Sequence, residues 1–326
     1  MIKTIAWTLV RYGLTFFIAS VIIFVLIRVI PGDPAAVSLG ITATPEAIAA
    51  LQSQLGTDQP LINQYFSWVS GMLSGNFGTS LSSGQDLSPL ILDRMQVSLI
   101  LVICSIVLSL LIAVPLGILS ARRGGLIISG ISQLGIAIPS FLAGILLVAV
   151  FAVGWGWLPA NGWIPPSEDF GGFLARLILP VLALSAVQAA ILTRYVRSAV
   201  IDVLGEDFMR TARSKGMSFN RALLVHGLRN AALPVLTVTG LQLTTLVIGA
   251  VVIEQVFVIP GIGSMLLESV SNRDLVAVQS IVMVLVAFTL LVNLIVDLLY
   301  QVVDPRIGAH SSDMGFADRT VSGSVI

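Results

Sequence analysis

The sequence predicts an all-α integral membrane protein with six transmembrane helices, and three observations support this prediction. Of the 326 residues, 56% are hydrophobic and only 10% are charged, which lies far outside the range of soluble domains. The apolar residues gather in segments close to the ~20 residues that a helix needs to cross a bilayer. The Lys and Arg residues are distributed unequally between the connecting segments, as is typical of multi-pass membrane proteins.

The apolar segments can be placed in order along the chain. The first follows Lys3 and Arg11 and is similar to a secretory signal, but it is long enough to span and no small-residue cleavage site follows it. We therefore expect an uncleaved first span. Pro139 lies inside the third segment and predicts a kink there. The expected spans are residues 1–30, 97–120, 126–153, 177–196, 231–253 and 275–296.

The segment between the first two spans predicts a small helical cap outside the membrane. Thr44 suits a helix N-cap, Pro45 the first helical position, and Gly56 the end of that helix. Ser88 and the proline after it predict the start of another helix that leads into the membrane. A second, amphipathic helix is indicated by Ile62, Tyr65, Phe66, Val69 and Leu73.

The predicted organisation has four parts. They are residues 1–30 (amino terminus and first span), 31–96 (extracytoplasmic helical cap), 97–309 (core of five spans, with a cytoplasmic loop at 197–233) and 310–326 (flexible cytoplasmic tail). Orientation follows from the positive charges, because cytoplasmic segments are enriched in Lys and Arg. With both termini in the cytoplasm, the only Lys and Arg residues left outside are Arg28, Arg94, Arg176 and Arg273.

The loop at 197–233 is a long insert between spans that is polar, basic and helix-forming. Gly216 suits a helix end with positive φ, Ser218 can accept the first free amides of a following helix, and Pro234 fits the first turn of the next span. Two interpretations stay open: a basic loop near anionic lipid headgroups, or a docking helix for a cytoplasmic partner. If the helical path continues across the turn, one apolar stripe contains Phe208, Ala212, Phe219 and Leu223.

The loop resembles the EAA loop of ABC-importer permeases, whose pattern is Glu-Ala-Ala, three residues, Gly, nine residues, Ile, one residue and Leu-Pro. Ala212 and Gly216 match that pattern in register. The sequence departs from it at Arg210, Thr211, His226 and Leu228-Arg229. The form Gly-Glu-Asp-Phe-Met-Arg-Thr-Ala-Arg-Ser-Lys-Gly, ending at Gly216, is similar to one branch of the family, the B-type subunit of dipeptide and oligopeptide permeases.

Several expectations follow from this resemblance. It implies the type I ABC importer permease fold in a bacterial inner or plasma membrane, a second homologous permease, two cytoplasmic ATPase subunits and an extracytoplasmic substrate-binding protein. ATP and Mg²⁺ would be held by the ATPases, and this chain would bind no cofactor and no metal. The ATPase-coupling residues would be Glu206, Asp207, Arg210, Thr211, Ala212, Arg213, Lys215, Gly216, Phe219 and Arg221.

The sequence lacks the motifs that would give this chain its own chemistry. Its lysines are Lys3 and Lys215, and neither follows a glycine, so a Gly-Lys-Ser/Thr phosphate loop is excluded. Its histidines are His226 and His310, which excludes a His-Glu-x-x-His zinc site. We therefore expect a transport subunit rather than an enzyme.

The spans carry few polar side chains. The candidate translocation path consists of Gln133, Gln188, Gln242 and Asn293, although hydrogen bonding between helices is the commoner role of such amides. Glu254 is a candidate outer gate or an interface residue. Sparse charge inside the spans favours an ATP-driven importer over a self-contained secondary carrier or channel. Di- or oligopeptides are the expected substrate, with nickel complexes or glutathione as alternatives within the family.

Overall fold

The computed structural model describes residues 2–29, 35, 39, 43–122 and 125–303. The expected tail at 310–326 and most of the stretch at 30–42 lie outside these described residues. Within them the regular structure is helical, and β pairing is limited to an isolated bridge between Thr79 and Asp86. The prediction of an all-α membrane protein is therefore confirmed.

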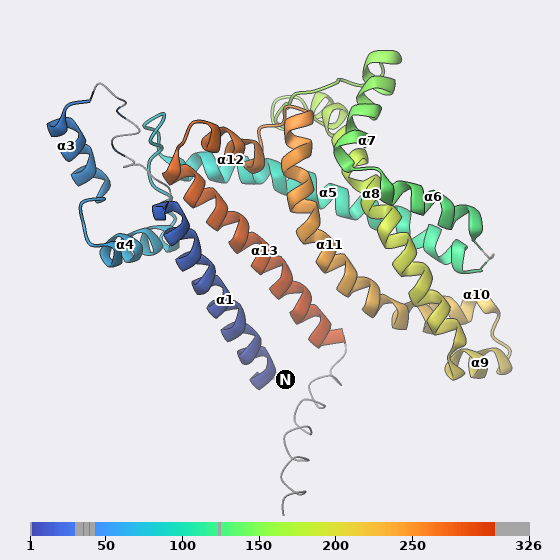
Figure 1. Cartoon of the computed structure of the whole chain (residues 1–326). Helices are drawn as coiled ribbons and strands as arrows, with labels where there is room; N and C mark the ends of the chain where they lie inside the picture. The colour runs from blue at the N-terminus through green and yellow to red at the C-terminus, as the bar shows by residue number, and fades with distance from the viewer. Residues whose placement is uncertain (1, 30–34, 36–38, 40–42, 123–124, 304–326) are drawn as a thin grey trace, which may run out of the picture.

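Long apolar helices form the membrane part (Figure 1). The described residues contain five helices long and apolar enough to cross a bilayer, and a sixth candidate made of two helices with a sharp bend between them. The six expected spans coincide with these helices, apart from residues 1 and 30 of the first, which lie outside the described residues. The five continuous helices are α1 (Ile2–Val29), α5 (Leu87–Arg122), α8 (Phe170–Gly205), α11 (Leu228–Val256), which continues the helical turns before it, and α13 (Leu275–Val303).

The third span is broken rather than kinked. It consists of α6 (Leu126–Ala137), α7 (Ser140–Leu147) and a π-helical turn η1 (Val148–Gly154), with an angle of 98° between its two parts. Pro139 has no amide to donate and its ring pushes Ile138 out of the helical region, to φ −91° and ψ 119°. In Figure 1, α7 accordingly turns away from the direction of α6.

The helices α5 and α8 form the centre of the bundle. They approach closely because small residues lie between them: a Cβ on Gly117 would lie 2.6 Å from the Cβ of Val196. Further along the same interface, the Ser109 hydroxyl donates a hydrogen bond to the carbonyl of Ser185 over 3.2 Å. Small residues and hydroxyls of this kind are typical of helix packing in membranes, where backbones must come close together.

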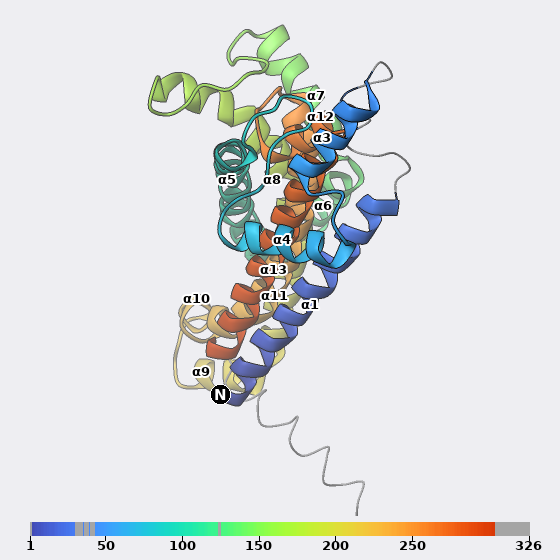
Figure 2. The ribbon, with the colours of Figure 1, turned by 90° about the vertical axis from the view of Figure 1, so that its left-hand side faces the viewer.

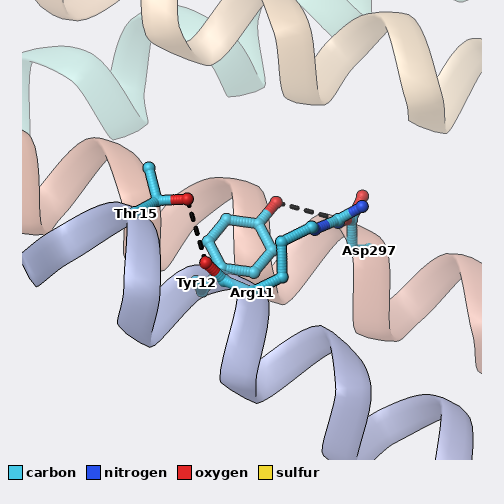
Figure 3. Close-up of polar contacts among 4 residues, drawn as sticks. All are labelled: Arg11, Tyr12, Thr15 and Asp297. Carbon is cyan, nitrogen blue, oxygen red and sulfur yellow. Dashed lines mark hydrogen bonds and ion pairs between the residues drawn. The ribbon is translucent and has the colours of Figure 1, made fainter. Parts of the chain in front are cut away.

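The first and last spans lie side by side at one edge of the bundle, as the two views show (Figures 1 and 2). Figure 3 shows the polar contact that joins them, between Arg11 of α1 and Asp297 of α13. The start of α1 lies at the same end of the bundle as the short helices α9 and α10, whereas α3 and α12 lie at the opposite end (Figures 1 and 2).

From residue 43 onward, the described part of the predicted cap contains two separate helices, α3 (Pro45–Leu55) and α4 (Leu61–Leu73). The start of α3 is as expected, since the Thr44 hydroxyl accepts a hydrogen bond from the amide of Ala47 over 3.3 Å. Its end is also as expected, because Gly56 has a φ of 67°. The helix α4 packs against α1 through an aromatic group in which the hydroxyls of Tyr65 and Ser20 are 2.7 Å apart.

The third cap helix is the beginning of α5 itself, so the cap continues into the second span without interruption. Asp86 caps this helix rather than Ser88, since its carboxylate accepts a hydrogen bond from the Ser88 amide over 2.8 Å. The same amide lowers the pKa of Asp86 below its usual value. The Ser88 hydroxyl instead accepts a hydrogen bond from the amide of Phe77, which holds the end of the cap onto α5.

Candidate coupling and translocation sites

The polar loop folds as a pair of short helices, α9 (Asp207–Ser214) and α10 (Phe219–Ala222), which we call the α9–α10 pair. The turn between them depends on Gly216, whose φ of 84° is costly for any residue with a Cβ. Its amide donates to the Arg213 carbonyl (3.0 Å) and the next amide donates to the Ala212 carbonyl (3.2 Å). These two bonds form a Schellman motif, which satisfies the free carbonyls at the end of α9.

The buried face of the α9–α10 pair differs from the predicted stripe. Ala212 and Leu223 are buried as expected, and Phe219 is half-buried. Phe208, however, is 37% exposed, and the buried position is taken by Met209, which is 1% exposed. The prediction at Phe208 was wrong because the packing of the short helix α9 decides which of its sides faces inward, and this packing places Met209 rather than Phe208 in the core beside Ala212.

The charged side chains of the pair point away from the core. Arg213, Lys215 and Arg221 are exposed and lie off the apolar stripe. Arg210 is exposed as well, and its only ion pair in the described part of the chain is with Asp207, at 3.5 Å between two strongly exposed side chains. Such surface pairs contribute little to stability. Glu206 and Thr211 are also exposed, so most of the predicted coupling residues present a polar, basic surface to their surroundings.

A residue outside the predicted loop fixes the position of this pair. Arg122, the last residue of α5, places its guanidinium carbon 5.2 Å from the centre of the Phe219 ring and donates a hydrogen bond to Asn220 over 2.5 Å. The guanidinium of Arg213 lies 6.0 Å from the same ring centre. Its place in the basic turn after the second span was the one sequence signal that could have indicated Arg122.

Two expectations at the end of the loop are corrected. Ser218 has the extended backbone of an N-cap, but its side chain makes no capping hydrogen bond to α10. Pro234 lies inside α11 rather than in its first turn. The reason is the π-helical turn η2 (Leu223–Gly227), which joins α10 to α11 without a break, so the fifth span begins earlier than its apolar segment.

The structure brings two of the four candidate path residues together. Gln188 of α8 is buried, and its amide nitrogen lies 3.5 Å from the hydroxyl of Thr245 on α11. That hydroxyl donates to the side-chain oxygen of Gln242 over 2.8 Å. Asn293 of α13 lies apart from this group, with its amide nitrogen 3.4 Å from the Thr244 hydroxyl. These contacts join helices through amide and hydroxyl groups, as polar residues in spans commonly do.

Gln133, the remaining candidate, is exposed on α6 and does not take part in these contacts. Sequence reasoning missed Thr244 and Thr245, which connect the candidates on α11 to its neighbours. Their only sequence signal was two adjacent hydroxyl residues in an apolar segment.

The candidate gate residue, Glu254, is almost fully buried, with 1% of its surface exposed. Its carboxylate accepts hydrogen bonds from the Ser98 hydroxyl (2.5 Å) and from the Ser264 amide (2.9 Å). The Ser98 oxygen in turn accepts the amide of Ile262 over 2.8 Å. Glu254 and Ser98 therefore satisfy free amides at the start of α12 (Ile262–Ser271) and join α5, α11 and α12.

Gly261 makes this arrangement possible. A Cβ at that position would lie 2.1 Å from the carboxylate carbon of Glu254, so only glycine leaves room for the buried side chain. Within the described residues, no group of three or more His, Cys, Asp or Glu side chains is arranged to hold a metal ion.

A bundle of long apolar helices, with an exposed basic helix pair at one end and amide groups between its helices, defines a multi-pass membrane protein. Residues 113–309 match the family described as binding-protein-dependent transport system inner membrane component, and residues 1–102 match the N-terminal family of the same membrane components. The chain belongs to this family of ABC transporter permeases, which are multi-pass proteins of the inner membrane.

Three relatives are similar over nearly their whole length. The probable peptide ABC transporter permease y4tP of Sinorhizobium fredii is 37% identical, over 88% of this chain and 93% of that protein. The oligopeptide transport system permease AppB of Bacillus subtilis is 38% identical, over 88% and 93%. The glutathione transport system permease GsiC of Escherichia coli is 39% identical, over 90% and 94%.

A solved structure supports the fold independently of close sequence similarity. It is a crystal structure of an amino acid ABC transporter with histidines, with a TM-score of 0.52 and 16% identity. The match covers 65% of this chain and 94% of that chain. At this identity, the likeness concerns the permease fold alone.

Proposed function

We propose that this chain is the membrane-spanning subunit of an ATP-driven importer of di- or oligopeptides. An extracytoplasmic binding protein delivers the peptide, and two separate ATPase subunits hold ATP and Mg²⁺ and supply the energy. The relatives named for peptide, oligopeptide and glutathione transport support this class of substrate. A second, homologous permease subunit completes the membrane part.

The observation that carries the proposal is the α9–α10 pair, which is exposed on one side and held against the rest of the protein on the other. Its buried side is fixed by Met209 and Ala212, and its far end is held by Arg122 on Phe219. The pair lies directly between two spans: α8 ends at Gly205, two residues before α9 begins, and α10 continues through η2 into α11. A movement imposed on this pair by an ATPase is therefore transmitted to both α8 and α11 as rigid elements.

The polar groups of these same two spans form the proposed path. Gln188 lies on α8, and Gln242 and Thr245 lie on α11, so a movement of the α9–α10 pair changes the positions of the groups that contact one another. Asn293 and Gln133 are the further path candidates. Glu254 serves as an outer gate in this proposal, because rearranging α11 disturbs its hydrogen bonds to α5 and α12.

The proposed orientation places the α9–α10 pair and both termini in the cytoplasm. The opposite end, with α3 and α12, then faces the binding protein (Figure 1). The excess of Lys and Arg at the α9–α10 end supports this orientation.

Uptake by cells with and without this gene tests the proposal. Labelled dipeptide, a longer peptide, glutathione and nickel are each supplied at equal membrane potential, with ATP depletion as the control. Loss of peptide uptake in cells without the gene, together with its dependence on ATP, is the expected result. Gene-dependent uptake that survives ATP depletion and follows the ion gradient would instead indicate a secondary carrier. If cells without the gene lose only the uptake of glutathione or of nickel, that compound is the substrate instead of a peptide.

A further inference from the structure

A polar cavity lies at the end of the bundle that carries α12. It is an open cavity with a volume of about 190 Å³, lined by the start of α5, by α12, by the start of α13 and by the segment at 80–87 that ends the cap. Arg94 of α5 and Glu268 of α12 both line it, together with the amide side chains of Gln85 and Asn272. Under the proposed orientation this cavity opens toward the binding protein.

One acidic residue of the cavity, Asp274, uses its hydrogen bonds within the protein. Asp274 is buried, and its carboxylate accepts hydrogen bonds from the hydroxyls of Ser80 (2.5 Å) and Ser82 (3.2 Å). Its other oxygen accepts the amide of Ala277 over 3.1 Å, at the start of α13. Asp274 thus caps a helix and holds the end of the cap in place, which leaves Arg94 and Glu268 as the available charges.

Arg94 and Glu268 line the same cavity without pairing. No ion pair joins them, and neither side chain has a hydrogen-bond partner in the described part of the chain. Arg94 also acts at longer range on Glu254, but both oxygens of Glu254 are occupied by Ser98 and Ser264. The cavity therefore offers the half-buried Arg94 and, at its rim, the exposed Glu268, and both side chains have unused hydrogen-bonding capacity.

We propose that this cavity binds the charged ends of a short peptide, with the terminal carboxylate at Arg94 and the terminal ammonium group at Glu268. A guanidinium is suited to bidentate binding of a carboxylate, and a carboxylate accepts hydrogen bonds from an ammonium group. A zwitterion satisfies both unpaired charges at once, whereas a simple anion or cation would leave one of them unpaired. Leu90 and Met265 supply an apolar wall for a peptide side chain.

The position of the cavity gives the site a role in transport. Arg94 is one helical turn from Ser98, the hydrogen-bond partner of Glu254, so the site lies next to the candidate outer gate. This inference rests on the proposed function in assigning the peptide as the ligand. It makes the permease itself, and not only a binding protein, a point at which the peptide's ends are recognised.

Direct binding to the full chain in lipid nanodiscs tests the proposal. The probes are Ala-Ala, N-acetyl-Ala-Ala, which lacks the ammonium group, and Ala-Ala amide, which lacks the carboxylate. Arg94→Gln should weaken binding of Ala-Ala by about tenfold or more, the loss expected for a hydrogen bond between charged groups, and leave Ala-Ala amide unaffected. Glu268→Gln should weaken Ala-Ala and leave N-acetyl-Ala-Ala unaffected. Arg94→Lys should retain part of the affinity.

Matched controls separate this effect from a general loss of structure. Arg176 is half-buried in α8, outside the cavity lining, and Glu168 precedes that helix. Arg176→Gln and Glu168→Gln should therefore leave all three affinities unchanged. An equal loss for all three probes in Arg94→Gln, or no binding of Ala-Ala to the wild-type chain, would overturn the proposal. The proposal would also be overturned if the only defect of the Arg94 or Glu268 variant were weaker binding of the substrate-binding protein. The cavity would then be a binding pocket for a side chain of that protein.

Uptake measured in parallel keeps this inference distinct from the proposed function. Suppose that cells import Ala-Ala in an ATP-dependent way, but that the Arg94 and Glu268 variants do not distinguish Ala-Ala from the probes that lack one charged end. The proposed binding site is then wrong, and the proposed import function stands. If instead the variants lose affinity only for probes that carry the matching charged end, while the cells import no peptide, the proposed binding site stands and the proposed transport function is wrong.

Discussion

Arg11 and Asp297 connect the first and last spans through a guanidinium nitrogen and a carboxylate oxygen that are 2.6 Å apart (Figure 3). The hydroxyl of Tyr12 donates to the same oxygen over 3.0 Å, so α1 presents two donors to one acceptor on α13. The side chains are 58% and 40% exposed, which limits the strength of the pair. Its main effect is to fix how α1 is rotated and shifted along α13.

We expect charge reversal to reveal this contact. Arg11→Asp and Asp297→Arg each place like charges together and should lower the free energy of unfolding by about 1 kcal/mol. The double variant restores opposite charges and should recover most of that loss. Thermal unfolding in detergent measures all three. Strictly additive losses in the double variant would mean that the two residues do not interact.

The buried side of the α9–α10 pair can be tested with two adjacent residues. Met209→Ala removes a fully buried side chain and should destabilise the protein by about 2–5 kcal/mol, or detach the pair locally. Phe208→Ala is the matched control, because Phe208 is substantially exposed and should change stability much less. Thermal unfolding, together with proteolysis of the loop, distinguishes the two. A larger effect at Phe208 would favour the continuous stripe that the sequence predicted.

The close approach of Gly261 to Glu254 predicts a non-additive pair of substitutions. Gly261→Ala introduces a Cβ where the carboxylate lies and should displace α12 from α5 and α11. Glu254→Ala removes the carboxylate and leaves amides of α12 without that partner. Because the second change also removes the obstacle to the first, the double variant should be less destabilised than the sum of the single variants. Additive losses would show that α12 has already shifted to make room.

Coupling is tested by the charges on the exposed side of the α9–α10 pair. Arg213→Glu with Lys215→Glu should abolish uptake at normal abundance in the membrane, because the surface that we propose meets the ATPase is reversed in charge. ATP hydrolysis should persist but no longer respond to substrate. Arg176→Glu, at the other end of α8, is the control. Normal uptake in the double variant would exclude a coupling role for these two residues.

Much of the fold was predictable because the bilayer imposes simple rules on the chain. Long apolar segments located every span, and local capping chemistry at Thr44 and Gly56 placed both ends of α3 correctly. The turn at Gly216 was predictable for the same reason, since it needs a residue without a Cβ. These features depend on a few neighbouring residues and on solvent.

The contacts between distant segments were not predictable. The position of Arg122 over Phe219 and the hydrogen bond between Ser98 and Glu254 each join separate helices, and the cavity that contains Arg94 and Glu268 is lined by residues of separate helices. No local pattern specifies such partners, because they depend on how the spans pack. For the same reason the sequence did not predict that Met209, rather than Phe208, is the buried residue. Which side of a short helix faces inward is set by the residues that it packs against.

The break at Pro139 has a consequence for what surrounds the third span. A helix that stops inside a bilayer leaves about four carbonyls at its end, and the next helix leaves about four amides at its start, without partners along the chain. Hydrocarbon tails offer these groups no hydrogen bonds, so irregular backbone at membrane depth persists only beside protein or water. We therefore expect the junction of α6 and α7, where Ile138 is 38% exposed, to face another polypeptide or water rather than lipid.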